Sequence, residues 1–121
     1  MRSKKTSRSS LIKQADKLFS QLIRSRGKCQ RCFSDKNLQC AHVVSRVNKH
    51  LRWNEDNALS LCLRCHIFWM HKSPLEFSEW FILNFPIQWG FLRREMHKIE
   101  PNLGETIEFA IERLQERLKN A

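Results

Sequence analysis

Two Cys-x-x-Cys pairs constrain the fold of this chain more than any other feature. Cys29 and Cys32 form the first pair, and Cys62 and Cys65 form the second. Each pair presents two thiolates from one short turn, and two turns complete the tetrahedral set of sulfur ligands that Zn²⁺ accepts. A thiol–disulfide redox pair is the alternative, but it goes with a thioredoxin-like βαβ pattern that the sequence lacks. The spacing predicts a structural zinc site. The fifth cysteine, Cys40, is expected to be a small buried residue on a strand.

The short chain limits how much stability a hydrophobic core alone can give the fold. A chain of 121 residues is expected to form one domain, in which a structural metal contributes materially to stability. No apolar run is long enough to span a membrane, and the first residues show no signal-peptide pattern. A cytoplasmic protein without a membrane partner is therefore expected, with cysteines that bind zinc instead of forming disulfides.

The charge is basic and unevenly distributed. The formal net charge is +10, with +8 on residues 1–28, +4 on residues 29–72 and −2 on residues 73–121. Such a balance predicts a polyanionic partner that binds the amino-terminal half and the cysteine-containing stretch. Residues 1–8 are rich in basic residues and serine, and are expected to form a disordered arm that lies along phosphates. The remainder, 9–121, is expected to be a single domain.

The predicted fold class is α+β, with a small zinc-bound ββα core flanked by helices. Apolar residues at helical spacing predict an amino-terminal helix over 9–26, ended by Gly27. The core is expected to occupy 28–72, with strands over 38–44 and 58–61. A helix that begins near residues 62–64 is expected to carry His66 and His71.

The third part, 73–121, is expected to be a helical extension. Ser73-Pro74-Leu75-Glu76 has the residues of a helix start, and the aromatic residues that follow favour core packing over a stacking platform. A short helix is expected over 88–98, with Arg93 and Arg94 exposed. Asn102–Glu105 resembles a capping box before a last helix, whose apolar residues follow a 4-3-4 spacing: Ile107, Ile111, Leu114 and Leu118. This face is expected to pack within the chain, and a homodimer through the same helix is the alternative.

Three residues between and beside the cysteine pairs suit phosphodiester hydrolysis. That reaction needs a base to activate water and a hard divalent cation to stabilise the developing charge. His42, at a predicted strand end, is a candidate base, and Asn57 is placed to orient it. His66 follows the second pair on a helix fixed by zinc, and is a candidate ligand for a second, catalytic metal. Taken singly, each has a structural interpretation: a hydrogen-bonded histidine, a turn residue and a neighbour of the zinc site.

The ordered set of motifs resembles the HNH endonucleases of the ββα-metal, or His-Me finger, type. The resemblance rests on Cys-x-x-Cys, Ala-His-Val-Val-Ser-Arg, Leu-Arg-Trp-Asn-x-Asp-Asn and Leu-Cys-x-x-Cys-His, and covers residues 28–72. It is strongest to small phage proteins, including the NinG/Rap recombination nucleases. The resemblance implies a bacterial or phage-infected host cell and a DNA substrate that is duplex, nicked or branched.

The resemblance also implies catalytic and metal-binding roles for the residues of this chain that stand at the family's motif positions. The resemblance implies His42 as general base, Asn57 as the residue that orients it, and His66 as a ligand of Mg²⁺ or Mn²⁺, with His71 a second, weaker candidate ligand. Arg46 and Arg52 would contact the DNA backbone, and the same role is expected of three further basic residues of the stretch: Lys49, Arg64 and Lys72.

One position departs from the family pattern. Ala41 stands where many HNH enzymes have an Asp or His metal ligand. Either the metal is held by His66 with help from His71, His50, Asp56 or water, or His42 has a different role. The sequence thus predicts a metal-dependent DNA endonuclease, with a non-catalytic zinc-finger nucleic-acid-binding module as the alternative. A third hypothesis, compatible with the first, is an adaptor that uses the acidic carboxy-terminal helices.

Overall fold

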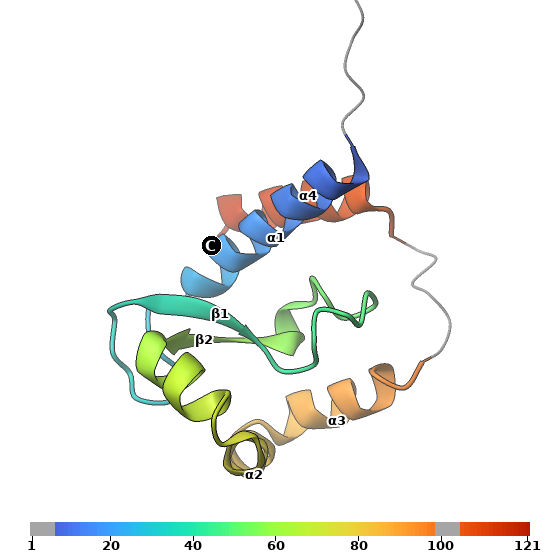
Figure 1. Ribbon diagram of the computed structural model, residues 1–121. Helices are drawn as coiled ribbons and strands as arrows, with labels where there is room; N and C mark the ends of the chain where they lie inside the picture. Colours follow the sequence, from blue (N-terminus) through green and yellow to red (C-terminus); the bar gives the residue numbers. More distant parts are fainter. Residues whose placement is uncertain (1–6, 99–104) are drawn as a thin grey trace, which may run out of the picture.

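A computed structural model describes residues 7–98 and 105–121, which form an α+β fold around a short antiparallel hairpin (Figure 1). The hairpin consists of β1 (Leu38–His42) and β2 (Ala58–Cys62). Helices α1 (Arg8–Arg24) and α4 (Ile107–Lys119) pack on one side of it. The π-helix η2 (Arg64–Met70), α2 (Pro74–Asn84) and α3 (Pro86–Glu95) pack on the other, and the 3₁₀ turn η1 (Glu55–Asn57) precedes β2. No helix in the described ranges has the length and apolar character needed to cross a membrane.

Helix α1 begins and ends close to its predicted bounds. The Ser7 hydroxyl accepts a hydrogen bond from the Ser10 amide at 3.2 Å and caps the helix at Arg8, so residues 7 and 8 are ordered and do not belong to a disordered arm. The rest of the predicted arm, residues 1–6, lies outside the described residues. After the last helical residue, Gly27 has a φ of +84°, a left-handed conformation that glycine adopts without steric cost.

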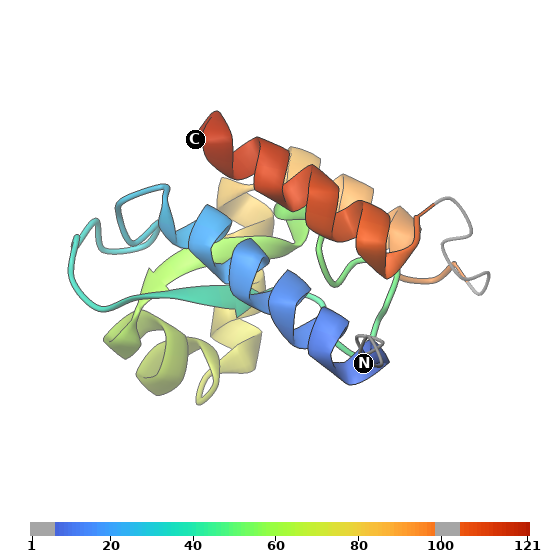
Figure 2. The same cartoon turned by 90° about the horizontal axis from the view of Figure 1, so that it is seen from above.

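Helix α4 packs along α1, and the chain runs in the same direction through both (Figure 2). The predicted apolar face of α4 forms one core cluster with Ala15, Phe19, Leu22 and Ile23, as expected for packing within the chain. The start of α4 differs from the prediction. Thr106 caps it by accepting a hydrogen bond from the Phe109 amide at 3.1 Å, whereas Glu105 pairs with Arg113 at 2.6 Å and Asn102 lies outside the described residues.

The hairpin separates two core clusters. All five residues of β2 are buried, with Leu59 and Leu61 in the cluster under α2 and α3, and Ala58 in the cluster under α1 and α4. Strand residues alternate between faces, so one short strand can supply both clusters. On β1, Ala41 joins the first cluster and Cys40 packs against the second. Strand β1 ends at His42, two residues before the predicted end.

The aromatic residues of α2 pack into the core, as predicted. Phe77 and Phe81 are buried and stack at a centroid distance of 5.9 Å, and Phe85 stacks on Phe81 at 5.5 Å. The helix begins at Pro74, as predicted, but its expected capping box does not form. Ser73 makes no side-chain cap, and the Glu76 carboxylate instead accepts a hydrogen bond from the Trp69 indole N–H at 2.9 Å.

Candidate functional site: a four-cysteine cluster beside a histidine-lined cavity

Four cysteines converge where the hairpin meets η2. The Sγ atoms of Cys29, Cys32, Cys62 and Cys65 all lie within 4.8 Å of one another, and those of Cys32 and Cys62 are 3.6 Å apart. A tetrahedral ion with bonds of about 2.3 Å to sulfur requires sulfur–sulfur distances of about 3.8 Å. All five cysteines are free thiols. The cluster can therefore hold a metal ion, and its soft donors suit zinc.

The surroundings of the cluster shift the pKa values of its thiols in opposite directions. Burial opposes ionisation, but backbone N–H groups of Cys32, Cys62 and Arg31 lower the pKa of Cys29 to about 6. Burial raises the pKa of Cys65 to about 12, so without an ion the four sulfurs cannot all ionise together. The Arg31 guanidinium donates to Cys65 Sγ at 3.5 Å and lies 3.6 Å from the centroid of the Trp69 ring, which places a positive charge beside the sulfurs.

Cys40 is separate from this cluster. It pairs with Ser60 in the hairpin, and burial raises the pKa of its thiol to about 11. The expected small residue on a strand is confirmed, but Cys40 is half-buried and not fully buried.

His42 is held at the end of β1 in one tautomer. Its Nε2 lies 2.9 Å from the Arg52 carbonyl oxygen, and its ring packs 5.4 Å from the Phe19 ring. A carbonyl oxygen only accepts, so Nε2 carries the proton and Nδ1 keeps its lone pair. Burial lowers the pKa of His42, and the Arg52 carbonyl opposes that shift only in part. The ring is therefore a neutral imidazole with one basic nitrogen.

The side-chain hydrogen bonds of Asn57 go to the loop between the strands and not to His42, so any orienting effect on that ring is indirect. Its Oδ1 accepts from the Val44 amide at 2.7 Å, and its Nδ2 donates to the carbonyls of Val44 at 2.9 Å and Leu51 at 3.1 Å. The side chain is fully buried, and it replaces strand pairing just after β1 ends. Asn57 thus shapes the loop between the strands, and Arg52 in that loop holds His42.

Replacing Asn57 by alanine is expected to destabilise the fold by roughly 2–5 kcal/mol, because buried backbone groups of Val44 and Leu51 lose partners at about 1–3 kcal/mol each. Urea unfolding of the zinc-loaded protein measures this free energy. Asn84→Ala, which removes one exposed side-chain hydrogen bond, is the control and should change it by less than about 0.5 kcal/mol. Equal effects of the two variants would contradict the role of Asn57 in the loop.

His66 and His71 lie together because η2 is a π-helix. The His71 amide donates to the His66 carbonyl at 3.1 Å, and the two rings meet edge to face with centroids 4.5 Å apart. In an α-helix, residues five apart would point about 140° away from each other. The His66 Nδ1 lies 2.8 Å from Gln39 Oε1, so Nδ1 donates and Nε2 keeps its lone pair. Burial lowers the pKa of His66 to about 4, and repulsion from a protonated His71 or His42 acts in the same direction.

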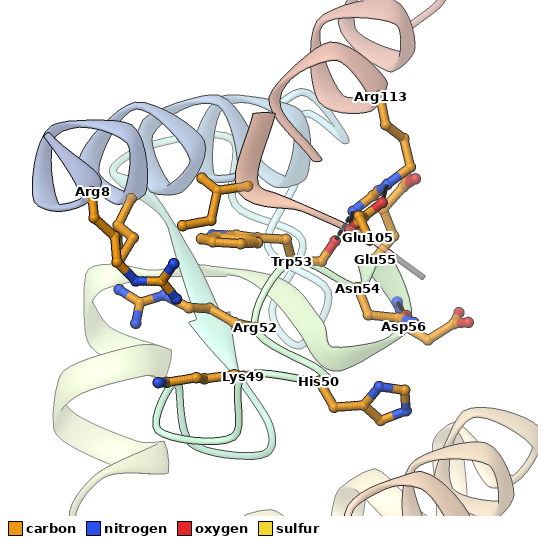
Figure 3. Close-up of a pocket in the computed structure, with 12 residues that line it drawn as sticks. Arg8, Lys49, His50, Arg52, Trp53, Asn54, Glu55, Asp56, Glu105 and Arg113 are labelled. Atoms are coloured by element: carbon orange, nitrogen blue, oxygen red, sulfur yellow. Dashed lines mark hydrogen bonds and ion pairs between the residues drawn. The ribbon is translucent and has the colours of Figure 1, made fainter. Parts of the chain in front are cut away.

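These three histidines line one cavity of about 490 Å³. It lies between α1, the end of β1 and η2, and its other lining residues are Asp16, Ser20, Cys40, Ser45 and Arg46. His50 and Asp56, named as alternative metal ligands, line a different cavity beside Trp53 (Figure 3). His50 also pairs with Glu95 at 2.9 Å. Of the alternative protein ligands, only His71 shares a cavity with His66. Within residues 7–98 and 105–121, three or more ligand atoms converge only at the four cysteines.

The five basic residues expected to contact DNA differ in their freedom to do so. Arg46 lines the histidine cavity and is 60% exposed, with Asp16 at 3.9 Å. The Nε and Nη2 of Arg52 donate to Asp16 at 3.0 and 2.7 Å, so this guanidinium already has an anionic partner within the protein. A contact of Arg52 with the DNA backbone stays a prediction. The other three are exposed but line no part of the histidine cavity: Lys49, Arg64 and Lys72.

Two residues of the site were not singled out from the sequence. Asp16 organises Arg52, and Gln39 orients His66. The only signal for Asp16 was its isolation as the single acidic residue among residues 1–28. Gln39 gave no signal, since polar residues commonly occupy the exposed face of a strand. Comparisons of the chain with protein-family models, with curated proteins and with solved structures gave no match.

Proposed function

We propose that this protein is a metal-dependent DNA endonuclease of the HNH, ββα-metal type. The observation that carries the proposal is the pair of imidazoles on one cavity with opposite tautomers. His42 keeps its lone pair on Nδ1, and His66 keeps its lone pair on Nε2. A general base and a metal ligand both require a neutral ring with a fixed free nitrogen. Two neutral histidines on one cavity supply both.

In the proposed reaction, His42 Nδ1 takes a proton from water as the water attacks the phosphorus, and the bond to the leaving oxygen breaks. Mg²⁺ or Mn²⁺ would stabilise the charge that develops on the phosphate and the leaving oxygen. His66 would hold this ion, with His71 as second candidate; these hard cations keep several waters, so few protein ligands suffice. Arg46 would hold a non-bridging phosphate oxygen.

Zinc has a separate, structural role in the proposal. The four cysteines come from the loop after α1, the end of β2 and the first turn of η2. An ion bound to all four would fix the position of η2 relative to the hairpin, and with it the position of His66 relative to His42. The catalytic histidines would then be oriented before DNA binds.

The charge distribution supports a DNA partner. The net charge of +10 provides affinity for phosphates that is independent of sequence and weakens with salt. Duplex, nicked and branched DNA all present such phosphates, and the branched form is proposed only on the likeness to the NinG/Rap nucleases.

A non-catalytic zinc-finger nucleic-acid-binding module is the second candidate. One observation favours it: Ala41, at the position of the missing metal ligand, is fully buried against the core cluster of Leu59 and Leu61. Nothing at that position can reach a metal. Such a module accounts for the charge and the cysteines, but it gives no reason for two oppositely oriented neutral imidazoles on one cavity.

A cleavage assay separates the two candidates. The full zinc-loaded chain is incubated with linear, nicked and four-way-junction DNA in Mg²⁺, in Mn²⁺, in Ca²⁺ and in a chelator selective for these ions over zinc. Cleavage in Mg²⁺ or Mn²⁺ that is absent in the His42→Ala preparation supports the nuclease. Binding without cleavage in every metal would leave the binding module as the function.

The pH dependence of cleavage is expected to follow His42. The base acts in its neutral form, and burial lowers its pKa below the ordinary value of 6.5. Protonation therefore removes activity only as the pH falls through this lowered pKa, and kcat/KM should stay above half of its maximum at pH 6.5. A profile of kcat/KM between about pH 5 and pH 8 measures this. A midpoint above 6.5 would contradict the burial of the base.

A further inference from the structure

One carboxylate links α1 to the loop that holds His42. Asp16 Oδ1 accepts from Arg52 Nε at 3.0 Å and from the Trp53 indole N–H at 2.8 Å. Asp16 Oδ2 accepts from Arg52 Nη2 at 2.7 Å. A two-point contact between a carboxylate and a guanidinium fixes direction as well as distance. Asp16 therefore determines where the Arg52 side chain lies, and the Trp53 contact restrains the next residue.

The backbone of Arg52 carries this restraint to the candidate base. The Arg52 carbonyl is the acceptor 2.9 Å from His42 Nε2, and it fixes the tautomer of that ring. Asn57 holds the other side of the loop: its Oδ1 accepts a hydrogen bond from the Val44 amide, and its Nδ2 donates one to the Leu51 carbonyl. Figure 3 shows Arg52 and Trp53 side by side beneath α1. The position of the Arg52 carbonyl is thus restrained by the Asn57 amide, which binds the preceding residue Leu51, and by Asp16, which binds the Arg52 side chain.

We propose that Asp16 is a positioning residue for His42: through the Arg52 side chain it places the Arg52 carbonyl that keeps the proton of His42 on Nε2. The consequence for catalysis rests on the proposed function, whereas the effect on the ring does not. In this role Asp16 touches neither substrate nor metal.

The contacts of Asp16 favour a positioning role over that of the missing metal ligand. Both oxygens already accept charge-assisted or indole hydrogen bonds, and Arg46 lies 3.9 Å from Oδ2. Asp16 is ionised, because these partners outweigh the burial that opposes ionisation and lower its pKa. Its charge neutralises Arg52, and Arg46, with the longer contact and 60% exposure, is left as the cation for a phosphate.

The test compares two carboxylates that make similar contacts. Asp16→Ala removes the anchor of Arg52. Glu55→Ala is the matched control, because Glu55 also holds an arginine at two points, Arg117 at 2.9 and 2.8 Å, and joins α4 to the same stretch without touching Arg52. Zinc content and thermal unfolding establish that each variant is folded.

The first readout is the imidazole nitrogen signals of His42 in ¹⁵N-labelled full-length protein, which distinguish the two tautomers. Wild type and Glu55→Ala are expected to show one tautomer, with the proton on Nε2. Asp16→Ala is expected to show exchange between tautomers. A single unchanged tautomer in folded, zinc-loaded Asp16→Ala would overturn the proposal. If Asp16→Ala does not fold, the isosteric Asp16→Asn is judged by the same criterion.

The second readout is cleavage. Asp16→Ala is expected to lower kcat by roughly 10- to 100-fold with little change in KM, since a base misplaced by about 1 Å can cost that much. A merely structural anchor would lower kcat no more than Glu55→Ala does, and that result would overturn the catalytic consequence. If wild type cleaves no DNA in any metal, the proposed function fails, and the tautomer measurement still decides the link between Asp16 and His42.

Discussion

Removal of zinc is expected to unfold the hairpin and η2 together. Three of the four cysteines belong to the larger core cluster, so an ion bound by the four sulfurs would be anchored to that core. Structural zinc sites supply about 10–16 kcal/mol of apparent binding free energy, which matches or exceeds the total stability of about 5–15 kcal/mol of an ordinary domain. Cys65→Ser should therefore abolish stoichiometric zinc and the cooperative unfolding transition. A strong chelator added to wild type should do the same.

The fifth cysteine provides the control for this prediction. Cys40→Ser changes the same atom on a strand next to the cluster but outside it. It should keep one zinc per chain, with only a modest loss of stability. Metal analysis by mass spectrometry and far-ultraviolet circular dichroism measure the two quantities. Full helicity and a sharp unfolding transition in metal-free Cys65→Ser would contradict the structural role of the cluster.

His42→Ala is expected to lower the rate of DNA cleavage by about 10²- to 10⁴-fold, the usual contribution of a positioned general base. DNA affinity measured in Ca²⁺ should change little, because binding depends on phosphate contacts from basic residues. Zinc content should not change, since His42 is no ligand of the cluster. Single-turnover cleavage and equilibrium binding on the same DNA separate the two effects.

The matched control is His97→Ala, which removes an exposed histidine that lines none of the cavities described above. It should cleave at the wild-type rate. If both variants retained activity, His42 would not be the base. If His42→Ala lost DNA binding and cleavage together, the ring would serve the interface instead of the chemistry.

Local patterns allowed much of the fold to be predicted. Helical periodicity gave α1 and the packing face of α4, and the cysteine spacing gave a cluster that the structure brings together. These features depend on residues near one another in sequence. The predicted start of α4 was wrong, because Thr106 supplies the cap and Glu105 pairs with Arg113.

The site was harder to predict, because its contacts join distant segments. Arg52 looked like a free cation in sequence, but Asp16, 36 positions earlier, occupies it. Asn57 looked like the partner of His42, yet its side-chain amide forms hydrogen bonds with the backbone N–H and C=O of Val44. These backbone groups need a partner because β1 ends at His42 and strand pairing stops there. No periodicity or motif encodes either pairing.

The π-helical geometry of η2 determines which side chains of this helix meet at the candidate site. His71 is brought beside His66 by the extra residue in the turn, so the two rings depend on backbone geometry more than on their own side-chain contacts. If η2 tightened to an ordinary α-helix with its sequence unchanged, the two histidines, five residues apart, would point about 140° away from each other. Both imidazoles would remain in the sequence, but they would no longer be neighbours in space.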